Sequence, residues 1–341
     1  VDIQFTLITL PARKWKMRMQ VAAHWMAEQM LTLYKEGVTF DAILCSTFLD
    51  VAVLRSLLAQ QDLQLLLAVS FHENQFAYPN RINDPAFFQF TNINWTTALS
   101  ADRIFFNSKF NYDTFLSGIE LFLKLSSDVD LLRTIQQIQN KSTVLYPGID
   151  YSVIDQAASV HAQCSRPVII WNHRWEHDKD PEAFFSALFM LKKQRIDFKL
   201  IVLGQHFQNQ PEIFSVASEI LKNEIIHFGY AEDRKKYAAL LTRGDVVVST
   251  AKHEFFGISV LEAVRAGCCP LVPDRLSYPE LYPPEFRYDR EHLQEALVRV
   301  LRKQGNPQRK EYHRLAAKFS WHKVAKNYKE HLLRLCSMMK I

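Results

Sequence analysis

The chain lacks the features that mark a membrane or a secreted protein. It contains no stretch of about eighteen uncharged apolar residues, and the nearest candidate, residues 42–58, is interrupted by Asp50 and Arg55. Its N-terminus carries no apolar run followed by a small-residue cleavage site. A membrane-spanning helix is therefore not expected, a leader ahead of Val1 stays an open alternative, and we predict a cytoplasmic protein without a membrane partner.

Glycine and cysteine are also scarce. The nine glycines form neither a Gly-x-Gly-x-x-Gly fingerprint nor a Walker loop, which argues against a dehydrogenase or an NTPase. Five cysteines, an odd number at scattered positions, do not indicate a disulfide framework and suit a reducing compartment. Cys268 and Cys269 are adjacent, follow Gly267 and lack metal-ligand spacing, so we interpret them as core residues.

The chain is long and rich in apolar residues. Its 341 residues, 48% hydrophobic and 23% charged, suit two globular domains of about 150 to 180 residues each. Apolar runs alternate with helical segments in both halves, which predicts an α/β fold of parallel sheets flanked by helices. The strands are expected at residues 4–10, 42–45, 65–71, 103–107, 143–145, 168–171, 199–204, 225–228, 245–249 and 270–272.

Helical segments separate these strands and dominate the end of the chain. Residues 18–34 are one such segment, and the last three helices are expected at residues 291–303, 306–318 and 321–339. Asp180 and Pro181 predict a helix start, with the aspartate as cap and the proline as first residue. Tyr-Pro-Gly-Ile-Asp at residues 146–150 has the Pro-Gly punctuation of a tight connection near mid-chain.

Two carboxylates eight positions apart, Glu254 and Glu262, are the most informative feature. Glu254 is expected in the loop after the strand at residues 245–249, and Glu262 inside the helix that follows Gly257. Open parallel sheets bind ligands where strands end and helices begin, and a helix start favours an anion such as a diphosphate. Glu262 would then accept hydroxyls such as those of a ribose. The alternative is that both acids are only solvated.

Polar residues at two other strand ends could also bind parts of a sugar nucleotide. Arg174 and Lys179 fall in the loop after residues 168–171, where they would be available to a diphosphate. His72 follows the predicted buried strand at residues 65–71. A neutral imidazole there could bond a sugar hydroxyl, although a histidine after a strand is often structural.

Together these segments resemble a known family. The Glu-x7-Glu spacing, the Arg174/Lys179 pair and the Pro-Gly-Ile-Asp segment look like those of a retaining glycosyltransferase of family four. Three longer motifs are similar to the tRNA-queuosine α-mannosyltransferase family: Phe-His-Glu-Asn-Gln, Trp-Asn-His-Arg-Trp-Glu-His-Asp-Lys-Asp-Pro-Glu and Ser-Thr-Ala-Lys-His-Glu-Phe-Phe-Gly. The resemblance covers nearly the whole chain. It implies a GT-B fold of two facing Rossmann-like domains.

That fold implies a division of the chain. Residues 1–148 would form an acceptor-side domain, residues 149–320 a nucleotide-sugar-binding domain, and residues 321–341 a C-terminal helix that packs back on the first domain. Members of the family begin with a strand and a Gly-Ser-His loop ahead of the segment that here starts at Val1. The first βα unit is therefore expected to be missing, which puts the activity of the chain in question.

The resemblance also implies a reaction and its site. Mannose would pass, with retention of configuration, from GDP-mannose to the cyclopentene diol of queuosine at the wobble position of a tRNA for aspartate, without cofactor or metal. His72 and Glu254 would act on the sugar, while Arg174 and Lys179 neutralise the leaving diphosphate. Further donor contacts would come from Phe255, Phe256, Gly257, Glu262, Gly204, Gly229 and Tyr230, and acceptor contacts from Glu73, Asn74, Asn107 and Ser108.

A second pattern points to different chemistry. His173, Glu176 and His177 match the His-x-x-Glu-His pattern of some zinc proteases. That chemistry needs both histidines on one helical face with a third ligand nearby. Here the pattern precedes a helix start, so we interpret it as a loop that orders a phosphate site.

Charge says little about the acceptor. The formal net charge of +5 is a mild bias towards anions. A basic cluster with one interleaved aromatic could hold a phosphate backbone and stack a base, or be only a solvated face: Arg13, Lys14, Trp15, Lys16 and Arg18. Two rivals to the tRNA reaction are a transferase of the same fold with a lipid or polysaccharide acceptor, and a catalytically silent RNA-binding relative. The oligomeric state is not predicted.

Overall fold

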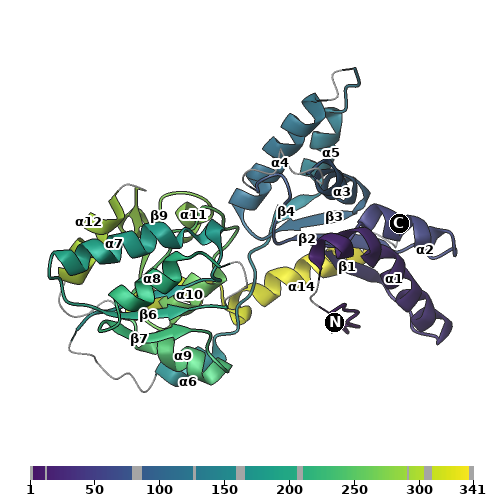
Figure 1. Ribbon diagram of the computed structural model, residues 1–341. Helices are drawn as coiled ribbons and strands as arrows, with labels where there is room; N and C mark the ends of the chain where they lie inside the picture. The colour runs from purple at the N-terminus through teal and green to yellow at the C-terminus, as the bar shows by residue number, and fades with distance from the viewer. Residues whose placement is uncertain are drawn as a thin grey trace. The chain divides into compact units, whose positions relative to one another are not determined.

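The computed structural model describes residues 3–11, 14–78, 87–125, 128–158, 166–205, 210–289, 292–302 and 309–337. The chain divides into two units (Figure 1), of which unit 1 comprises Val1–Pro147 and Ala325–Ile341, and unit 2 comprises Gly148–Val324. Each unit has its own parallel sheet. Among the helices described, none combines the length and the apolar character needed to cross a membrane.

Unit 1 is built on a four-stranded sheet with the strand order β1-β2-β3-β4. Neighbouring strands are parallel, and Val69 lies opposite Cys45 on one side and Ile104 on the other. The strands are β1 (Ala42–Ser46), β2 (Leu66–Phe71), β3 (Arg103–Phe106) and β4 (Ser142–Val144). The connecting helices are α1 (Trp15–Lys35), α2 (Val51–Ala59), α3 (Phe87–Ser100), α4 (Lys109–Lys124) and α5 (Arg133–Asn140).

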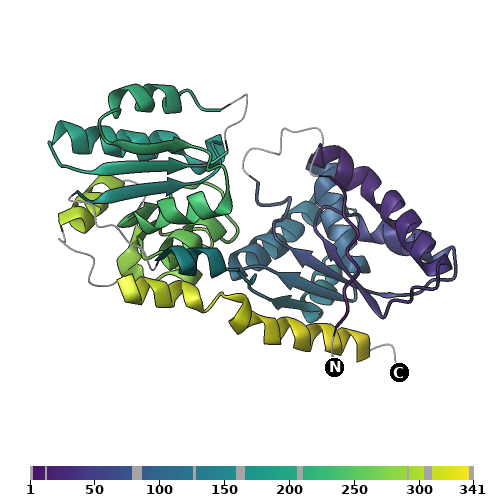
Figure 2. The same ribbon diagram turned by 90° about the horizontal axis from the view of Figure 1, so that it is seen from below.

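The core of unit 1 lies on both faces of this sheet, because β2 and β3 carry apolar side chains on each face. On one face the rings of Phe71, Phe106 and Phe115 pack within 5.2 Å of one another. On the other face lies α14 (Trp321–Ser337), whose Leu335 packs with Phe105 among others (Figure 1, Figure 2). The part of the last helix that belongs to unit 1, from Ala325 onward, therefore contributes to the unit 1 core.

The strand expected at residues 4–10 is wrong, because this segment is irregular and joins neither sheet. A strand needs a neighbour that takes its backbone N–H and C=O groups. Ile8 and Leu10 instead pack against the unit 1 core through their side chains, while Phe5 and Leu7 are 71% and 86% exposed. The alternation of apolar residues in residues 4–10 therefore reflects side chains that pack on the core, not a strand that pairs with a neighbour.

Unit 2 contains a six-stranded sheet with the order β10-β9-β8-β5-β6-β7, in which all neighbours are parallel. Every residue of β5 and β9 is buried, as expected for strands covered on both faces. The strands are β5 (Val168–Asn172), β6 (Lys199–Leu203), β7 (Ile225–Gly229), β8 (Val246–Val248), β9 (Cys269–Pro273) and β10 (Arg287–Tyr288). The two-residue β10 is too short to give an alternation signal and was not predicted.

Helices lie on both sides of the unit 2 sheet (Figure 2). In one group α7 packs against α8 and α12, and in another α10 packs against α6, α9 and α13. The longer elements are α6 (Ser152–Ala158), α7 (Pro181–Lys193), α8 (Ile213–Ile220), α9 (Arg234–Thr242), α10 (Ile258–Arg265), α12 (Leu293–Arg302) and α13 (Arg309–Ala317). The short ones are η2 (His177–Lys179), α11 (Tyr278–Leu281) and η3 (Pro284–Phe286).

The strand order of unit 2 reverses beside β5. From β5 the chain passes through α7 to β6 on one side, whereas β8, which comes later in the chain, pairs with the other side of β5. In open α/β sheets, ligands bind beyond the carboxyl ends of the strands at such a switch point. The loops that follow β5 and β8 are therefore the expected walls of a ligand site.

Candidate functional site

The loops after β5 and β8 are tied to each other beside the switch point. The backbone N–H of Lys252 donates to the carbonyl of Asp178 at 2.8 Å, and the Thr250 hydroxyl donates to the carbonyl of Lys179 at 2.7 Å. Two cross-links of this kind hold the loops in one arrangement. Residues of the two loops are therefore held close to one another beside the switch point.

Lys179 and Glu254 form a pair at the centre of these loops. The Lys179 ammonium donates to the His253 carbonyl at 2.7 Å and lies 3.4 Å from a Glu254 carboxylate oxygen and 3.2 Å from Asp178. Burial alone would lower the pKa of Lys179, but the charges of Glu254 and Asp178 raise it above its ordinary value. Burial would likewise raise the pKa of Glu254, and Lys179 above all lowers it. Both groups are charged at neutral pH.

The Glu254 carboxylate also accepts hydrogen bonds from the chain that follows it. The backbone N–H groups of Phe255 and Phe256 lie 3.1 and 3.4 Å from its Oε1 atom, and both phenylalanines are buried. The predicted donor contacts of these two residues stay a prediction, and in this structure their amides lie against the Glu254 carboxylate. The start of α10 after Gly257 still leaves first-turn N–H groups without partners inside the helix, and these favour an anion.

Glu262 lies inside α10 and is 6% exposed. One carboxylate oxygen accepts from the Arg234 guanidinium at 2.6 Å and the other from the Tyr237 hydroxyl at 2.5 Å. Asn172, at the end of β5, donates to the same hydroxyl at 2.7 Å. Burial and the Glu262 charge raise the pKa of Tyr237 well above its ordinary value, so it remains a donor. Two of the roughly four acceptor positions of a carboxylate remain for ligand hydroxyls.

Arg234 and Tyr237 were missed by the sequence analysis. Both lie in α9, which begins shortly after the carboxyl end of β7. Their position could have identified them from the sequence, because a helix that starts beyond the end of a strand borders the ligand-binding edge of a parallel sheet. Within the sequence Arg-Lys-Lys-Tyr, however, the arginine resembles any solvated basic residue.

Arg174 and Asp180 behave differently from the buried pair. The Arg174 side chain is 61% exposed and forms an ion pair of 3.1 Å with Glu176, so it is accessible to an anionic ligand. The helix start at Pro181 is confirmed. Asp180 occupies the N-cap position as predicted, but its side chain makes no cap hydrogen bond, and its carboxylate pairs with Lys252 at 2.8 Å.

Gly204 and Gly229 lie together at the carboxyl ends of β6 and β7, where the Gly204 N–H donates to the Gly229 carbonyl at 3.2 Å. Both have positive φ, 151° and 134°. A side chain at Gly204 would place its Cβ 1.8 Å from the His173 carbonyl oxygen, whereas nothing lies within 4 Å of the corresponding position at Gly229. Gly204 thus lets the β6 end approach the β5 loop, and the neighbouring Tyr230 is 63% exposed.

This contrast gives a stability prediction. Gly204→Ala combines backbone strain with a backbone clash and is expected to lower the free energy of unfolding by about 3 kcal/mol or more. Gly229→Ala carries only the strain and is expected to cost about 1 kcal/mol. Urea denaturation of the two variants measures both values. Equal losses would show that the close approach to His173 does not matter.

The two histidines of the His-x-x-Glu-His pattern have different surroundings. His173 is buried against the Trp171 ring, and burial first, then the charge of Lys179, lowers its pKa to about 4. His177 starts a short 3-10 turn and its side chain is 75% exposed. Across the residues described, no three His, Cys, Asp or Glu side chains are grouped to hold a metal ion.

His72 is the functional candidate in unit 1, at the end of β2. Its Nδ1 atom lies 2.9 Å from the Thr47 hydroxyl, and its ring lies 5.1 Å from that of Phe48. His72 as a whole residue is exposed, but the groups packed around its ring lower the pKa of the imidazole below its ordinary value, which favours the neutral form. Asn107 donates to the His72 carbonyl at 2.8 Å and fixes the backbone that carries the ring.

Most of the residues expected on the acceptor side form hydrogen bonds that hold the loops after β2 and β3 in place. Asn74 is fully buried, donates to the Asn111 side chain at 2.8 Å and accepts from two backbone N–H groups. Ser108 is fully buried and caps α4 by accepting from the Asn111 N–H at 3.0 Å. We therefore assign Asn74, Asn107 and Ser108 to holding the strand ends. Glu73 is partly exposed and accepts from Gln75 at 3.0 Å.

The basic cluster lies at the start of α1. Lys14 precedes the helix, Lys16 lies 5.9 Å from the Trp15 ring centre, and both lysines are exposed. Arg18 is partly exposed, and Arg13 lies outside the described residues. Trp15 packs against Phe48, so the cluster borders the surroundings of His72.

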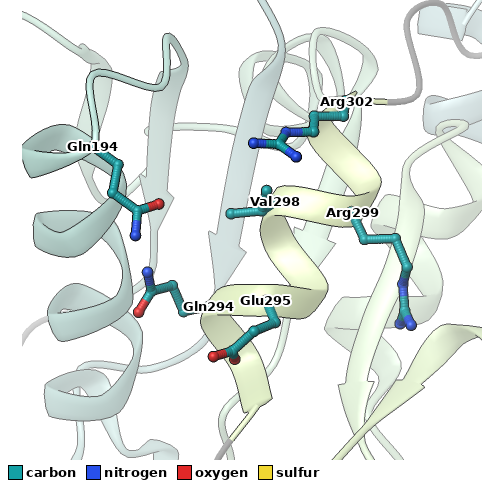
Figure 3. A pocket seen from close by; sticks show the side chains of 6 residues that line it. All are labelled: Gln194, Gln294, Glu295, Val298, Arg299 and Arg302. Atoms are coloured by element: carbon teal, nitrogen blue, oxygen red, sulfur yellow. The ribbon is translucent and has the colours of Figure 1, made fainter.

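A separate hollow of about 600 Å³ lies in unit 2 beside α7 and α12 (Figure 3). Its lining shares no residue with the loops at the switch point, so it is not part of the site described above. The lining residues are Gln194, Gln294, Glu295, Val298, Arg299 and Arg302.

Comparisons with known proteins match both units. A family profile described as tRNA-queuosine alpha-mannosyltransferase N-terminal matches residues 1–149, and one described as glycosyl transferases group 1 matches residues 155–318. A tRNA-queuosine alpha-mannosyltransferase of Drosophila melanogaster is 35% identical over 293 residues, which is 83% of this chain and 75% of the relative. A GDP-mannose:cellobiosyl-diphosphopolyprenol alpha-mannosyltransferase of Xanthomonas oryzae pv. oryzae (strain PXO99A) is 22% identical over 38% of this chain and 34% of the relative.

Solved structures are similar over most of the chain. A glycosyltransferase from Rickettsia africae ESF-5 has a TM-score of 0.66 at 15% identity and covers 96% of this chain and 84% of its own. Sucrose-phosphate synthase from Thermosynechococcus elongatus has a TM-score of 0.67 at 14% identity, with coverages of 97% and 81%. At this identity the likeness establishes the fold, which is that of the GT-B glycosyltransferases.

Proposed function

The chain belongs to the tRNA-queuosine alpha-mannosyltransferase family, and on this premise we propose that it transfers mannose from GDP-mannose to the cyclopentene diol of queuosine at the wobble position of a tRNA for aspartate. As a member of that family it is a glycosyltransferase. The observation that carries the proposal is the ion pair between the buried Lys179 and the partly buried Glu254 beside the start of α10.

The chemistry of the donor supports this assignment of unit 2. Glycosyl transfer passes through an oxocarbenium-like transition state in which negative charge grows on the departing diphosphate. We propose that Arg174, Lys179 and the first-turn amides of α10 stabilise that charge, since preorganised positive groups act most strongly where charge develops. Glu254 would hold the sugar hydroxyls. Glu262, fixed by Arg234 and Tyr237, would accept the ribose hydroxyls.

In unit 1 we propose that His72 bonds a sugar hydroxyl as a neutral imidazole. Its position beyond the end of β2 and its lowered pKa support this role, because a charged ring would oppose the positive charge that grows on the sugar. With retention of configuration, a phosphate oxygen of the departing GDP would take the proton of the attacking hydroxyl. We expect the acceptor nucleoside to be unstacked and inserted, as is usual for recognition of exposed RNA bases.

A mass measurement tests the proposal. The protein is incubated with GDP-mannose and a queuosine-containing tRNA for aspartate, and the digested nucleosides are weighed. We expect a hexose mass increase on queuosine, and none on the same tRNA with guanosine at that position. With ample donor and enzyme, an unmodified queuosine would refute the proposal. Transfer to a lipid-linked or polysaccharide acceptor instead would assign the chain to the rival reaction.

A further inference from the structure

A surface of aromatic and basic side chains borders His72 in unit 1. We call Trp15 and Phe48, with the flanking Lys14 and Lys16, the Trp15–Phe48 surface. The ring centres of Trp15 and Phe48 are 6.1 Å apart, and that of Phe48 is 5.1 Å from His72. One aromatic ring therefore separates Trp15 from the histidine proposed to contact the transferred sugar.

This surface rests on a rigid base. The Trp15 ring packs at 5.4 Å against Phe90, which is 2% exposed and belongs to a small core cluster with Met19 and Ile93. Phe48 packs against the same cluster. Trp15 itself is 37% exposed, so part of its ring faces solvent while the rest is fixed by packing. A tryptophan held in this way offers a flat surface at little entropic cost.

The charge around the aromatic rings is positive. Lys14 and Lys16, which flank Trp15 in the sequence, are exposed, and the Lys16 ammonium lies 5.9 Å from the centre of the Trp15 ring. Single-stranded nucleic acid is bound by this combination, in which aromatic rings stack bases and nearby cations contact the phosphates. An apolar protein partner would not require the lysines, and a phosphate site alone would not require the exposed indole.

We propose that the Trp15–Phe48 surface stacks a nucleobase of the tRNA anticodon loop next to the nucleoside that receives the sugar, while Lys14 and Lys16 contact its phosphates. The inference rests on the proposed function, which places the reacting nucleoside near His72. Stacking is tolerant of base identity because every base has a flat face. The surface would thus fix the position of the loop rather than read its sequence.

Equilibrium binding tests the inference without depending on catalysis. The probe is a fluorescently labelled anticodon stem-loop of the tRNA for aspartate, measured by anisotropy at fixed salt. Trp15→Ala is expected to raise Kd about tenfold or more, and Trp15→Phe, which keeps an aromatic ring, to restore most of the affinity. The matched control is Tyr34→Ala, which removes an aromatic side chain that is 48% exposed near the other end of α1. It is expected to leave Kd unchanged.

Salt dependence separates stacking from charge and from misfolding. Lys16→Ala is expected to reduce the slope of log Kd against log salt by about one, because one phosphate contact is lost. Trp15→Ala is expected to leave this slope unchanged. Its Kd for GDP-mannose should match that of the wild-type protein, since donor binding is assigned to unit 2. Its thermal unfolding midpoint is expected to fall, because the Trp15 ring packs against Phe48 and Phe90, so both Kd values are measured well below that midpoint.

Three results would overturn the inference. One is a stem-loop Kd that Trp15→Ala does not change, and another is an equal loss of donor and stem-loop affinity, which would indicate a folding defect. The third is binding to anionic lipid vesicles, but not to the stem-loop, that Trp15→Ala abolishes. The proposed function fails separately, through the absence of mannose on queuosine with the wild-type protein.

Discussion

Glu254→Gln is expected to lower the rate of mannose transfer by about 100-fold or more. Glutamine keeps the size of the side chain but removes the negative charge that we propose faces the sugar as positive charge develops on it. It also offers one oxygen in place of two, so it cannot accept from the Phe255 and Phe256 amides while presenting an oxygen to Lys179. The measurement is kcat at saturating GDP-mannose and queuosine-containing tRNA.

The control for this variant is Glu219→Gln, an exposed glutamate on α8 in the same unit. It is expected to leave kcat unchanged, because an exposed side chain away from the switch point faces no reacting group. Circular dichroism of both variants should match that of the wild-type protein. Full turnover by Glu254→Gln would contradict the assignment of this carboxylate to the site.

Lys179→Met is expected to abolish transfer and to lower the free energy of unfolding by about 3 kcal/mol or more. Methionine fills the same volume but leaves Glu254, whose side chain is 19% exposed, next to Asp178 without the buried cation between them. Removing one partner of a buried pair costs more than the pair contributes, because the remaining charge keeps its desolvation cost. Urea denaturation at pH 7 measures the loss.

The pH dependence of this loss has a defined sign. In the wild-type protein the pKa of Glu254 is lowered, so its stabilising contribution is present above the pKa of the unfolded chain and is lost as the pH falls through the folded value. In Lys179→Met the pKa of Glu254 rises, and protonation at mildly acidic pH then relieves the unpaired charge. The difference in stability between the two proteins should therefore shrink as the pH falls.

Lys236→Met is the matched control for this prediction. Lys236 forms an i,i+4 pair of 3.1 Å with Glu232 on the surface of unit 2, with side chains 43% and 81% exposed. Exposed pairs contribute about 0–1 kcal/mol, so little change is expected at any pH. A Lys179→Met protein as stable as this control at pH 7 would show that the pair is not buried in solution.

Sequence patterns sufficed for those parts of the fold that depend on local sequence. The buried strands β5 and β6 are continuous apolar runs between polar loops, and Pro181 starts its helix where expected. The segment at residues 4–10 failed because its alternation is the same whether or not a neighbouring strand is available. Strand pairing depends on the tertiary structure, so the residues of the segment alone do not show whether a partner strand is present.

In the candidate site, too, some residues could be predicted from the sequence and others could not. Glu254, Glu262 and Lys179 could be chosen because each lies near a strand end or helix start that the sequence marks. Their partners could not: Tyr237 reaches Glu262 from α9, and Thr47 reaches His72 from the end of β1. The hydrogen bond from Asn74 to Asn111 could not be predicted either, because an amide after a strand looks the same in sequence whether it faces a ligand or a buried network.

A crystal structure of the protein with GDP bound tests the central claim most directly, namely that the loops after β5 and β8 in unit 2 form the donor site. We predict the diphosphate at the first turn of α10 within reach of Arg174, and the ribose hydroxyls on the Glu262 carboxylate. GDP bound elsewhere in unit 2, such as the hollow lined by Gln294 and Arg299, with Glu262 making no contact to it, would contradict the claim.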